Sequence, residues 1–211
     1  MSESEPRTRW SEVSGGLAAA TAYQQRFDDL AARGVDIHGE AAFVESLLPP
    51  PARVLDAGCG TGRVATQLTA LGYHCVGVDA DPDMVTVAHR RDPSTHFVRQ
   101  DLAALELRSQ AFELVVMAGN VVPLLAPGTL QQVLHRLVAH LQPGGLVVAG
   151  FGLDAGHLPE RVPPTPLEDY DRACDVAGLS MLRRHASWDG APWRAGGGYV
   201  VAVHRLNDPS A

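Results

Sequence analysis

The chain has 211 residues, of which 45% are hydrophobic and 19% charged, as is ordinary for one globular domain. Its net charge of −7 argues against a nucleic-acid partner, because affinity for phosphate comes mainly from clustered Lys and Arg. The first residues lack the apolar core of a signal peptide, and no apolar run approaches the roughly 18 residues of a membrane span. We therefore expect a cytoplasmic protein with no membrane partner.

The first 50 residues are expected to form a mobile N-terminus followed by two helices. Residues 1–14 are polar and are expected to be mobile. Apolar residues recur at intervals of three and four over 17–33, which predicts an amphipathic helix ending at Gly34. A second stripe of this kind predicts a helix over 37–48, which the following three prolines end.

From residue 51 to the end, at 211, we expect a single domain. Short apolar runs alternate there with helical patterns, which predicts a parallel sheet with helices on both faces. The expected strands cover 53–57, 73–79, 95–100, 112–118 and 145–151, and the expected helices cover 62–71, 81–91 and 128–141.

The last third of the chain shows a different pattern. Residues 152–166 contain four prolines and are expected to form a long loop, and a helix is expected over 167–177. Two strand-like runs, 180–188 and 198–206, flank a Gly-rich segment and predict an antiparallel hairpin. The predicted fold class is therefore α/β, with a doubly wound, mostly parallel seven-stranded sheet that ends in an antiparallel hairpin strand.

A glycine-rich turn follows the first expected strand. Three glycines stand at alternate positions, Gly58, Gly60 and Gly62, and they allow a sharp turn with no Cβ between the loop and a ligand. A dinucleotide site has the spacing Gly-x-Gly-x-x-Gly, but here Arg63 occupies the third glycine position, which disfavours NAD. A tight turn without a ligand remains the alternative interpretation.

Three acidic residues follow three successive expected strands. Asp56, Asp79 and Asp101 each stand where a strand ends, and the carboxyl ends of parallel strands meet at one edge of a sheet. An acid at the end of the second strand, about 20 residues after the first, is placed to accept hydrogen bonds from both ribose hydroxyls. Three acids at the ends of three successive strands are more than composition supplies by chance.

The ordered set of motifs resembles the class I S-adenosylmethionine-dependent methyltransferases. The similarity runs from about residue 53 to residue 151. It consists of Val54-Leu55-Asp56-Ala57-Gly58-Cys59-Gly60-Thr61-Gly62, Gly77-Val78-Asp79, Asp101-Leu102, Val115-Val116-Met117-Ala118-Gly119-Asn120 and Leu141-Gln142-Pro143-Gly144-Gly145-Leu146. The resemblance implies S-adenosylmethionine as the cofactor and S-adenosylhomocysteine as its product.

The resemblance also implies roles for individual residues. The backbone of Gly58, Cys59 and Gly60 would lie against the methionine part of the cofactor, with Asp56 near its amino group. Asp79 and Ala80 would hold the ribose, Met84 would pack on the adenine, and Asp101 and the Leu102 N–H would bind the adenine edge. The carbonyls of Ala118 and Gly119, with Asn120, would close the methionine side.

In the resembling family an N-terminal extension commonly folds over the cofactor as a lid. Tyr23, Arg26 and the segment His38-Gly39-Glu40 are the candidates for lid contacts here, and Arg26 is a candidate partner for the methionine carboxylate. The alternative is that Tyr23 belongs to the core and that Arg26, His38 and Glu40 are solvated or capping residues.

The methyl acceptor is expected to be a small molecule. Asn120 is followed by Val121-Val122-Pro123, which lacks the Pro-Pro-Tyr of amino-directed DNA methyltransferases, so a small and fairly apolar acceptor suits this segment. His157 lies in a C-terminal loop where substrate specificity is set, and is a substrate-contact candidate. His135 and His140 are expected at the surface, and no residue is predicted as the catalytic base.

Two other functions remain open at this point. One is an NAD-dependent oxidoreductase, which the glycine spacing disfavours; the other is a binding protein that keeps the cofactor site without catalysis. The three cysteines show no Cys-x-x-Cys spacing, so reduced thiols and no metal site are expected.

Overall fold

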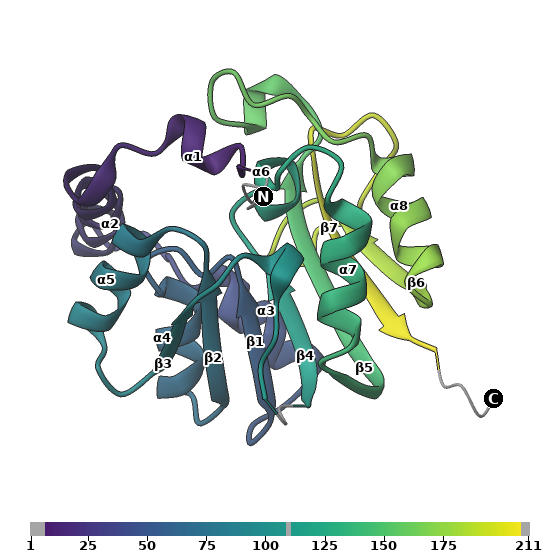
Figure 1. The fold of residues 1–211 in the computed structure, drawn as a ribbon, viewed down its shortest axis with the longest axis horizontal. Coiled ribbons are helices and arrows are strands. Elements are labelled where there is room, and N and C mark those ends of the chain that lie inside the picture. Colours follow the sequence, from purple (N-terminus) through teal and green to yellow (C-terminus); the bar gives the residue numbers. More distant parts are fainter. Residues whose placement is uncertain (1–6, 109–110, 208–211) are drawn as a thin grey trace, which may run out of the picture.

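The computed structural model describes residues 7–108 and 111–207 and contains one mixed seven-stranded sheet in the order β3-β2-β1-β4-β5-β7-β6 (Figure 1). Strands β1 to β5 run parallel, whereas β7 is antiparallel to both of its neighbours, β5 and β6. The strands are β1 Arg53–Ala57, β2 His74–Asp79, β3 His96–Arg99, β4 Phe112–Met117, β5 Leu141–Gly152, β6 Leu179–His185 and β7 Tyr199–Leu206. The predicted fold class, including the C-terminal hairpin, is confirmed.

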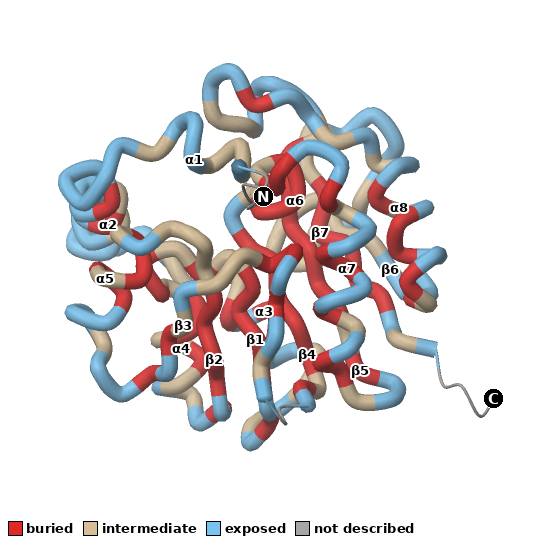
Figure 2. Tube along the Cα trace, viewed as in Figure 1, coloured by how far each residue is buried: buried red, intermediate tan, exposed pale blue. Residues whose placement is uncertain are grey.

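Helices cover both faces of the sheet. The α-helices are α1 Trp10–Val13, α2 Gly16–Ala32, α3 Gly39–Leu47, α4 Arg63–Ala70, α5 Pro82–Arg91, α6 Val121–Leu124, α7 Leu130–Val138 and α8 Leu167–Val176, and two 3-10 turns are η1 Leu102–Ala104 and η2 Ala155–His157. Successive strand residues point to opposite faces, so Leu55 of β1 packs in the core under α7 and α8, and Val54 packs in the core under α3 and α4. Figure 2 shows these buried strands between exposed helix surfaces.

Strand β1 lies at the point where the strand order reverses. It pairs with β2 on one side and with β4 on the other, both in parallel register. The chain therefore leaves β1 toward one edge of the sheet and later returns toward the other. In open α/β sheets such a point leaves a crevice beyond the carboxyl ends of the strands, which is where ligands bind.

Residues 7–16 are more structured than the sequence suggested, whereas residues 1–6, which were also expected to be mobile, lie outside the described residues. Helix α1 lies across the top of β2, where the Trp10 Nε1–H donates to Asp81 Oδ2 at 2.7 Å. Arg9 Nη1 donates to the carbonyl of Pro123 at 3.0 Å and so reaches α6. Helix α1 has four residues, which is about one turn. It is therefore too short to show the apolar periodicity by which a helix is predicted from sequence.

His140 is not the surface residue that we expected. Its exposed fraction is 8%, its Nδ1–H donates to the Arg136 carbonyl at 2.7 Å, and its Nε2 accepts from the Leu107 N–H at 2.9 Å. The reason is that α7 ends at Val138 rather than at residue 141, so His140 lies in the turn after the helix and not on its outer face. His135, which is within the helix, is exposed as expected.

The three cysteines are free, buried thiols, as expected. Within residues 7–108 and 111–207, no helix has both the length and the apolar character needed to cross a membrane. In the same part of the chain, no group of three or more His, Cys, Asp or Glu side chains is arranged to hold a metal ion.

Candidate functional site

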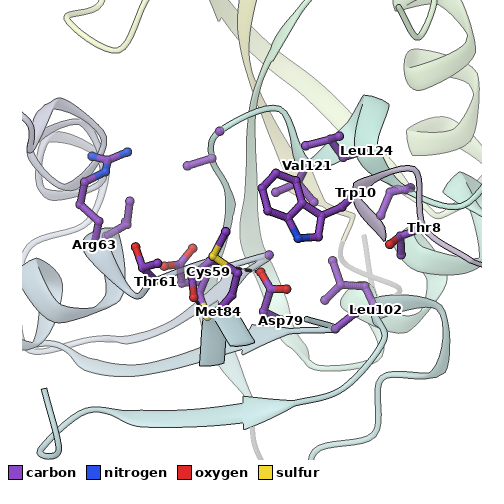
Figure 3. Close-up of a pocket in the computed structure, with 18 of the residues that line it drawn as sticks. Thr8, Trp10, Cys59, Thr61, Arg63, Asp79, Met84, Leu102, Val121 and Leu124 are labelled. Carbon is purple, nitrogen blue, oxygen red and sulfur yellow. Dashed lines mark hydrogen bonds between the residues drawn. The ribbon is translucent and has the colours of Figure 1, made fainter. Parts of the chain in front are cut away.

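A cavity lies beyond the carboxyl ends of β1, β2 and β4, where α1, α2 and α6 enclose it (Figure 3). The cavity brings together all the predicted cofactor-binding residues except Asn120. These lining residues are Asp56, Gly58, Cys59, Gly60, Asp79, Ala80, Met84, Asp101, Leu102, Ala118 and Gly119.

The glycine-rich turn forms the floor of this cavity. The N–H groups of Gly58 and Cys59 both donate to the Val78 carbonyl, at 2.8 and 3.0 Å, which ties the turn to the end of β2. Gly62 has a φ of +81°, and a Cβ on it would lie 2.5 Å from Cζ of Phe97. Gly60 has a φ of +55°, but no atom lies within 4 Å of the position of its Cβ. The turn therefore packs on the protein through Gly62 and faces open space through Gly60.

Asp56 holds the turn from below. It is 1% exposed, and its Oδ2 accepts from the N–H of Ala65 in the first turn of α4 at 3.0 Å. Burial raises the pKa of Asp56 to about 7. Its charge is thus costly in the free protein, and a cationic ligand group beside it would stabilise the ionised form.

Asp79 stands at the end of β2 on the cavity wall. Its Oδ2 accepts from the Gly60 N–H at 2.8 Å and its Oδ1 accepts from the Asp81 N–H at 2.9 Å. Burial raises the pKa of Asp79 to about 6, although these two hydrogen bonds oppose the rise. Each oxygen keeps a lone pair that can accept a further hydrogen bond from a ligand.

The third acid and an apolar wall complete the opposite end of the cavity. Asp101 Oδ1 accepts from the Ala103 N–H at 2.8 Å and begins the η1 turn that carries Leu102. Met84 of α5 packs with Trp10 and Tyr23 of the N-terminal helices. The side chains of Trp10, Met84 and Leu102 therefore form an apolar wall on both sides of the space next to Asp79 (Figure 3).

The cation on the cavity wall is Arg63, and not the predicted Arg26. Arg63 is the first residue of α4, and its guanidinium makes a bidentate pair with Glu40, at 2.5 and 2.7 Å. It also lies over the ring of Phe27, at 4.6 Å from the centroid. Arg26 instead lies over the rings of Tyr23 and Phe27 and lines a separate pocket beside α1 and α2. The sequence feature that could have predicted Arg63 as a cavity residue is its position directly after the glycine turn.

Of the other lid candidates, Tyr23 lines the cavity and His38 does not. Burial raises the pKa of Tyr23. His38 stands at the N-cap of α3 outside the cavity lining, with its Nδ1 buried and without a hydrogen-bond partner. Two further lining residues, Thr8 and Trp10, were not expected from the sequence, because they come from the segment in which no element was predicted.

Asn120 does not line the cavity, in contrast to the expectation. Its backbone is left-handed, with φ of 68°, and both ends of its side-chain amide are engaged. Its Oδ1 accepts from the Gly152 N–H at 2.7 Å and its Nδ2 donates to the His157 carbonyl at 2.9 Å. Asn120 therefore joins the end of β4 to the end of β5 and to the loop after it.

This geometry predicts the behaviour of two Asn120 variants. Asn120→Ala and Asn120→Gly lose the same two hydrogen bonds, but only alanine is strained at positive φ, by about 1–2 kcal/mol. We expect Asn120→Ala to melt at a lower temperature than Asn120→Gly, as calorimetry would measure. Equal melting temperatures would show that the left-handed backbone at this position is not retained.

Comparisons with known proteins agree with the fold. The family described as "Methyltransferase domain" matches residues 54–145. A dTDP-3-amino-3,6-dideoxy-alpha-D-glucopyranose N,N-dimethyltransferase of Streptomyces fradiae is 29% identical, over 81% of this chain and 66% of that protein. A demethylmenaquinone methyltransferase of Beutenbergia cavernae is 30% identical, over 85% of this chain and 88% of that protein.

A solved structure extends the similarity to nearly the whole described fold. The match to the TehB-like SAM-dependent methyltransferase from Corynebacterium glutamicum has a TM-score of 0.80 and 32% sequence identity. It covers 90% of this chain and 99% of the Corynebacterium chain. The sheet order, the antiparallel β7 and the acid-lined cavity on a glycine turn define a Rossmann-like cofactor-binding protein. The chain belongs to the class I S-adenosylmethionine-dependent methyltransferases, and its cofactor is S-adenosylmethionine.

Proposed function

We propose that this protein transfers the methyl group of S-adenosylmethionine to a small-molecule acceptor by in-line displacement. The observation that carries the proposal is the convergence of three acids, Asp56, Asp79 and Asp101, on one cavity whose floor is the bare backbone at Gly60. S-adenosylmethionine supplies an electrophilic methyl group on a sulfonium. The protein contributes mainly by holding donor and acceptor at a near-attack geometry, which is worth several kcal/mol.

The cavity fits the parts of this cofactor in a definite order. The open space at Gly60, next to Gly58 and Cys59, suits the methionine part, with Asp56 near the amino group. Asp79, beside Ala80, keeps lone pairs for the ribose hydroxyls. Met84 would pack on the adenine, and Asp101 and the Leu102 N–H would bind its edge.

The remaining predicted residues complete this assignment. The carbonyls of Ala118 and Gly119 would close the methionine side, and Asn120 would act by fixing the loop next to them. Tyr23 would cover the cofactor from α2 as a lid residue. Arg63, which lines the cavity, would take the place of Arg26 as the partner of the methionine carboxylate.

A small acceptor is consistent with the wall that α6 contributes. Val121, Leu124 and Leu125 line the cavity there and make this side apolar. The chain spans 66% of the length of the Streptomyces relative, so we do not assign the methyl acceptor of that protein to this chain. The cytoplasmic location and the lack of a nucleic-acid partner remain predictions of the sequence.

Calorimetric titration tests the proposal. We expect S-adenosylmethionine and S-adenosylhomocysteine each to bind at one site, and NADH not to displace them, because Arg63 stands where a dinucleotide fold needs glycine. Displacement by NADH would favour the oxidoreductase alternative. Tight cofactor binding without production of S-adenosylhomocysteine in the presence of any acceptor would favour a catalytically silent binding protein.

A further inference from the structure

A histidine–aspartate pair lies in the loop after β5, outside the lining of the cofactor cavity. The Nδ1 of His157 and the Oδ1 of Asp154 are 2.7 Å apart. An ionised carboxylate only accepts hydrogen bonds, so Nδ1 carries the proton and donates it, and the hydrogen bond lowers the pKa of Asp154. Nε2 is then the ring nitrogen with a free lone pair, and the side chain is 49% exposed. This is the tautomer that a general base requires.

Two glycines make room for this pair at the strand ends. A Cβ on Gly198, just before β7, would overlap Oδ2 of Asp154 and the ring of His157. A Cβ on Gly152, at the end of β5, would lie 2.8 Å from Cβ of His157. His157 is therefore packed against the backbone at Gly198 through its ring and at Gly152 through its Cβ, which restricts the position of the side chain.

The pair is connected to the cofactor cavity from two directions. The His157 carbonyl accepts from Asn120, which directly follows the cavity residue Gly119. The His157 ring lies 6.2 Å from the ring of Tyr199, at the start of β7. Burial raises the pKa of Tyr199 to about 12, and the charges of Glu40 and of the cavity residue Arg63 also act on it.

The Tyr199 ring therefore lies near the His157 ring, and its hydroxyl is within electrostatic range of Glu40 and Arg63. In Figure 1 the loop after β5 lies on the same side of the molecule as α6, beyond the carboxyl ends of the parallel strands. We propose that the methyl acceptor binds between the cofactor cavity and the His157 ring, and that His157, oriented by Asp154, is its general base. This inference rests on the proposed function and adds to it the chemical class of the acceptor.

The proposed step combines proton abstraction from the acceptor with transfer of the methyl group. A hydroxyl or protonated amine of the acceptor gives its proton to His157 Nε2, and the freed oxygen or nitrogen lone pair forms the new bond to the methyl carbon. The methyl–sulfonium bond breaks, its electron pair stays on the sulfur of S-adenosylhomocysteine, and His157 later releases the proton to water. A general base of this kind accelerates a reaction by about 10²–10⁴-fold.

The charged and titratable groups around His157 are few within the described residues. Asp154 faces the imidazole from its own turn and Tyr199 faces it from β7, whereas β5 and the start of α6 contribute the uncharged Gly152 and Asn120. Asp154 is therefore the charged neighbour whose substitution tests how the imidazole is oriented.

The test measures methyl transfer to three probes, namely catechol for a hydroxyl, glucosamine for an amine and dithiothreitol for a thiol. We expect the parent protein to methylate catechol or glucosamine, and His157→Gln to lower kcat/KM for that probe by about 100-fold or more. S-adenosylmethionine affinity, measured by calorimetry, should be unchanged. His96→Gln is the matched control, because His96 is exposed at the opposite end of the sheet, and it should keep full activity.

Two further readouts separate a base from a structural residue. Added imidazole should restore activity to His157→Ala, and Asp154→Asn should lower kcat by about tenfold with little change in KM, because the imidazole loses the carboxylate that orients it. Full activity of His157→Gln, or no rescue by imidazole, would overturn the proposal. So would a parent protein that binds the cofactor and methylates dithiothreitol alone or none of the probes. Absence of cofactor binding in the parent would instead overturn the proposed function itself.

Discussion

The Asp79→Ala variant is expected to bind S-adenosylmethionine at least about tenfold more weakly than the parent protein. Hydrogen bonds to a charged group contribute about 1.5–3 kcal/mol, and 1.4 kcal/mol corresponds to a tenfold change in Kd. The substitution removes the proposed ribose acceptor and also leaves the N–H groups of Gly60 and Asp81 without their present partner. Both effects reduce affinity, the second by loosening the glycine turn.

Calorimetric titration at pH 8 measures this effect. The control is Asp92→Ala, which removes a carboxylate that accepts from the Ser94 and Thr95 N–H groups, distant from the cavity. It should lower the melting temperature without changing cofactor affinity. An Asp79→Ala protein that binds as tightly as the parent would reject the assignment of Asp79 to the ribose.

The pH dependence of the parent protein checks the same carboxylate. Burial raises the pKa of Asp79 to about 6 in the free protein, above the ordinary value of 3.8. The carboxylate that accepts the ribose hydroxyls is therefore lost as the pH falls through about 6, and affinity should fall with it. The stability of the free protein depends on pH in the opposite direction. Because the pKa of Asp79 is raised in the folded state, the free energy of unfolding falls as the pH rises from about 4 to 6.

The Gly62→Ala variant is expected to cause the largest loss of stability. Gly62 has φ of +81°, where an alanine costs about 1–2 kcal/mol, and the new Cβ would lie 2.5 Å from Cζ of Phe97. Phe97 cannot move away easily, because its ring also covers Gly77, at 2.6 Å from the position of that residue's Cβ. Overpacking of this kind adds about 1–3 kcal/mol, so the total is about 2–5 kcal/mol.

Gly60→Ala is the matched partner of this substitution. Gly60 lies in the same turn with φ of +55°, but no atom is within 4 Å of its Cβ position. It should pay only the backbone cost of about 1–2 kcal/mol and melt well above Gly62→Ala. Its cofactor affinity should nevertheless fall, because the added methyl group enters the space proposed for the methionine part. Parental affinity in Gly60→Ala would show that the cofactor does not lie on this backbone.

Much of this protein could be predicted from local sequence patterns. The alternation of strands and helices, the glycine turn and the acids at Asp56, Asp79 and Asp101 are short-range features, and parallel strands necessarily bring their carboxyl ends to one edge. Helix ends were less well predicted, and the error at α7 changed the environment of His140 from surface to interior. One or two residues at a helix end are enough to move a side chain off the helix face.

The features that only the tertiary structure decided all join segments distant in the chain. Arg63 rather than Arg26 reached the cavity because Glu40 of α3 pairs with it, and α1 is held in place by the Trp10–Asp81 hydrogen bond. The placement of His157 and Asp154 against Gly198 likewise depends on β7 lying next to β5. The sequence by itself determined the fold class, which follows from local periodicity, and the resemblance of its ordered motifs to a known family implied the cofactor. The tertiary structure decided which charged side chains meet at the site, because such contacts depend on packing between elements that no local pattern encodes.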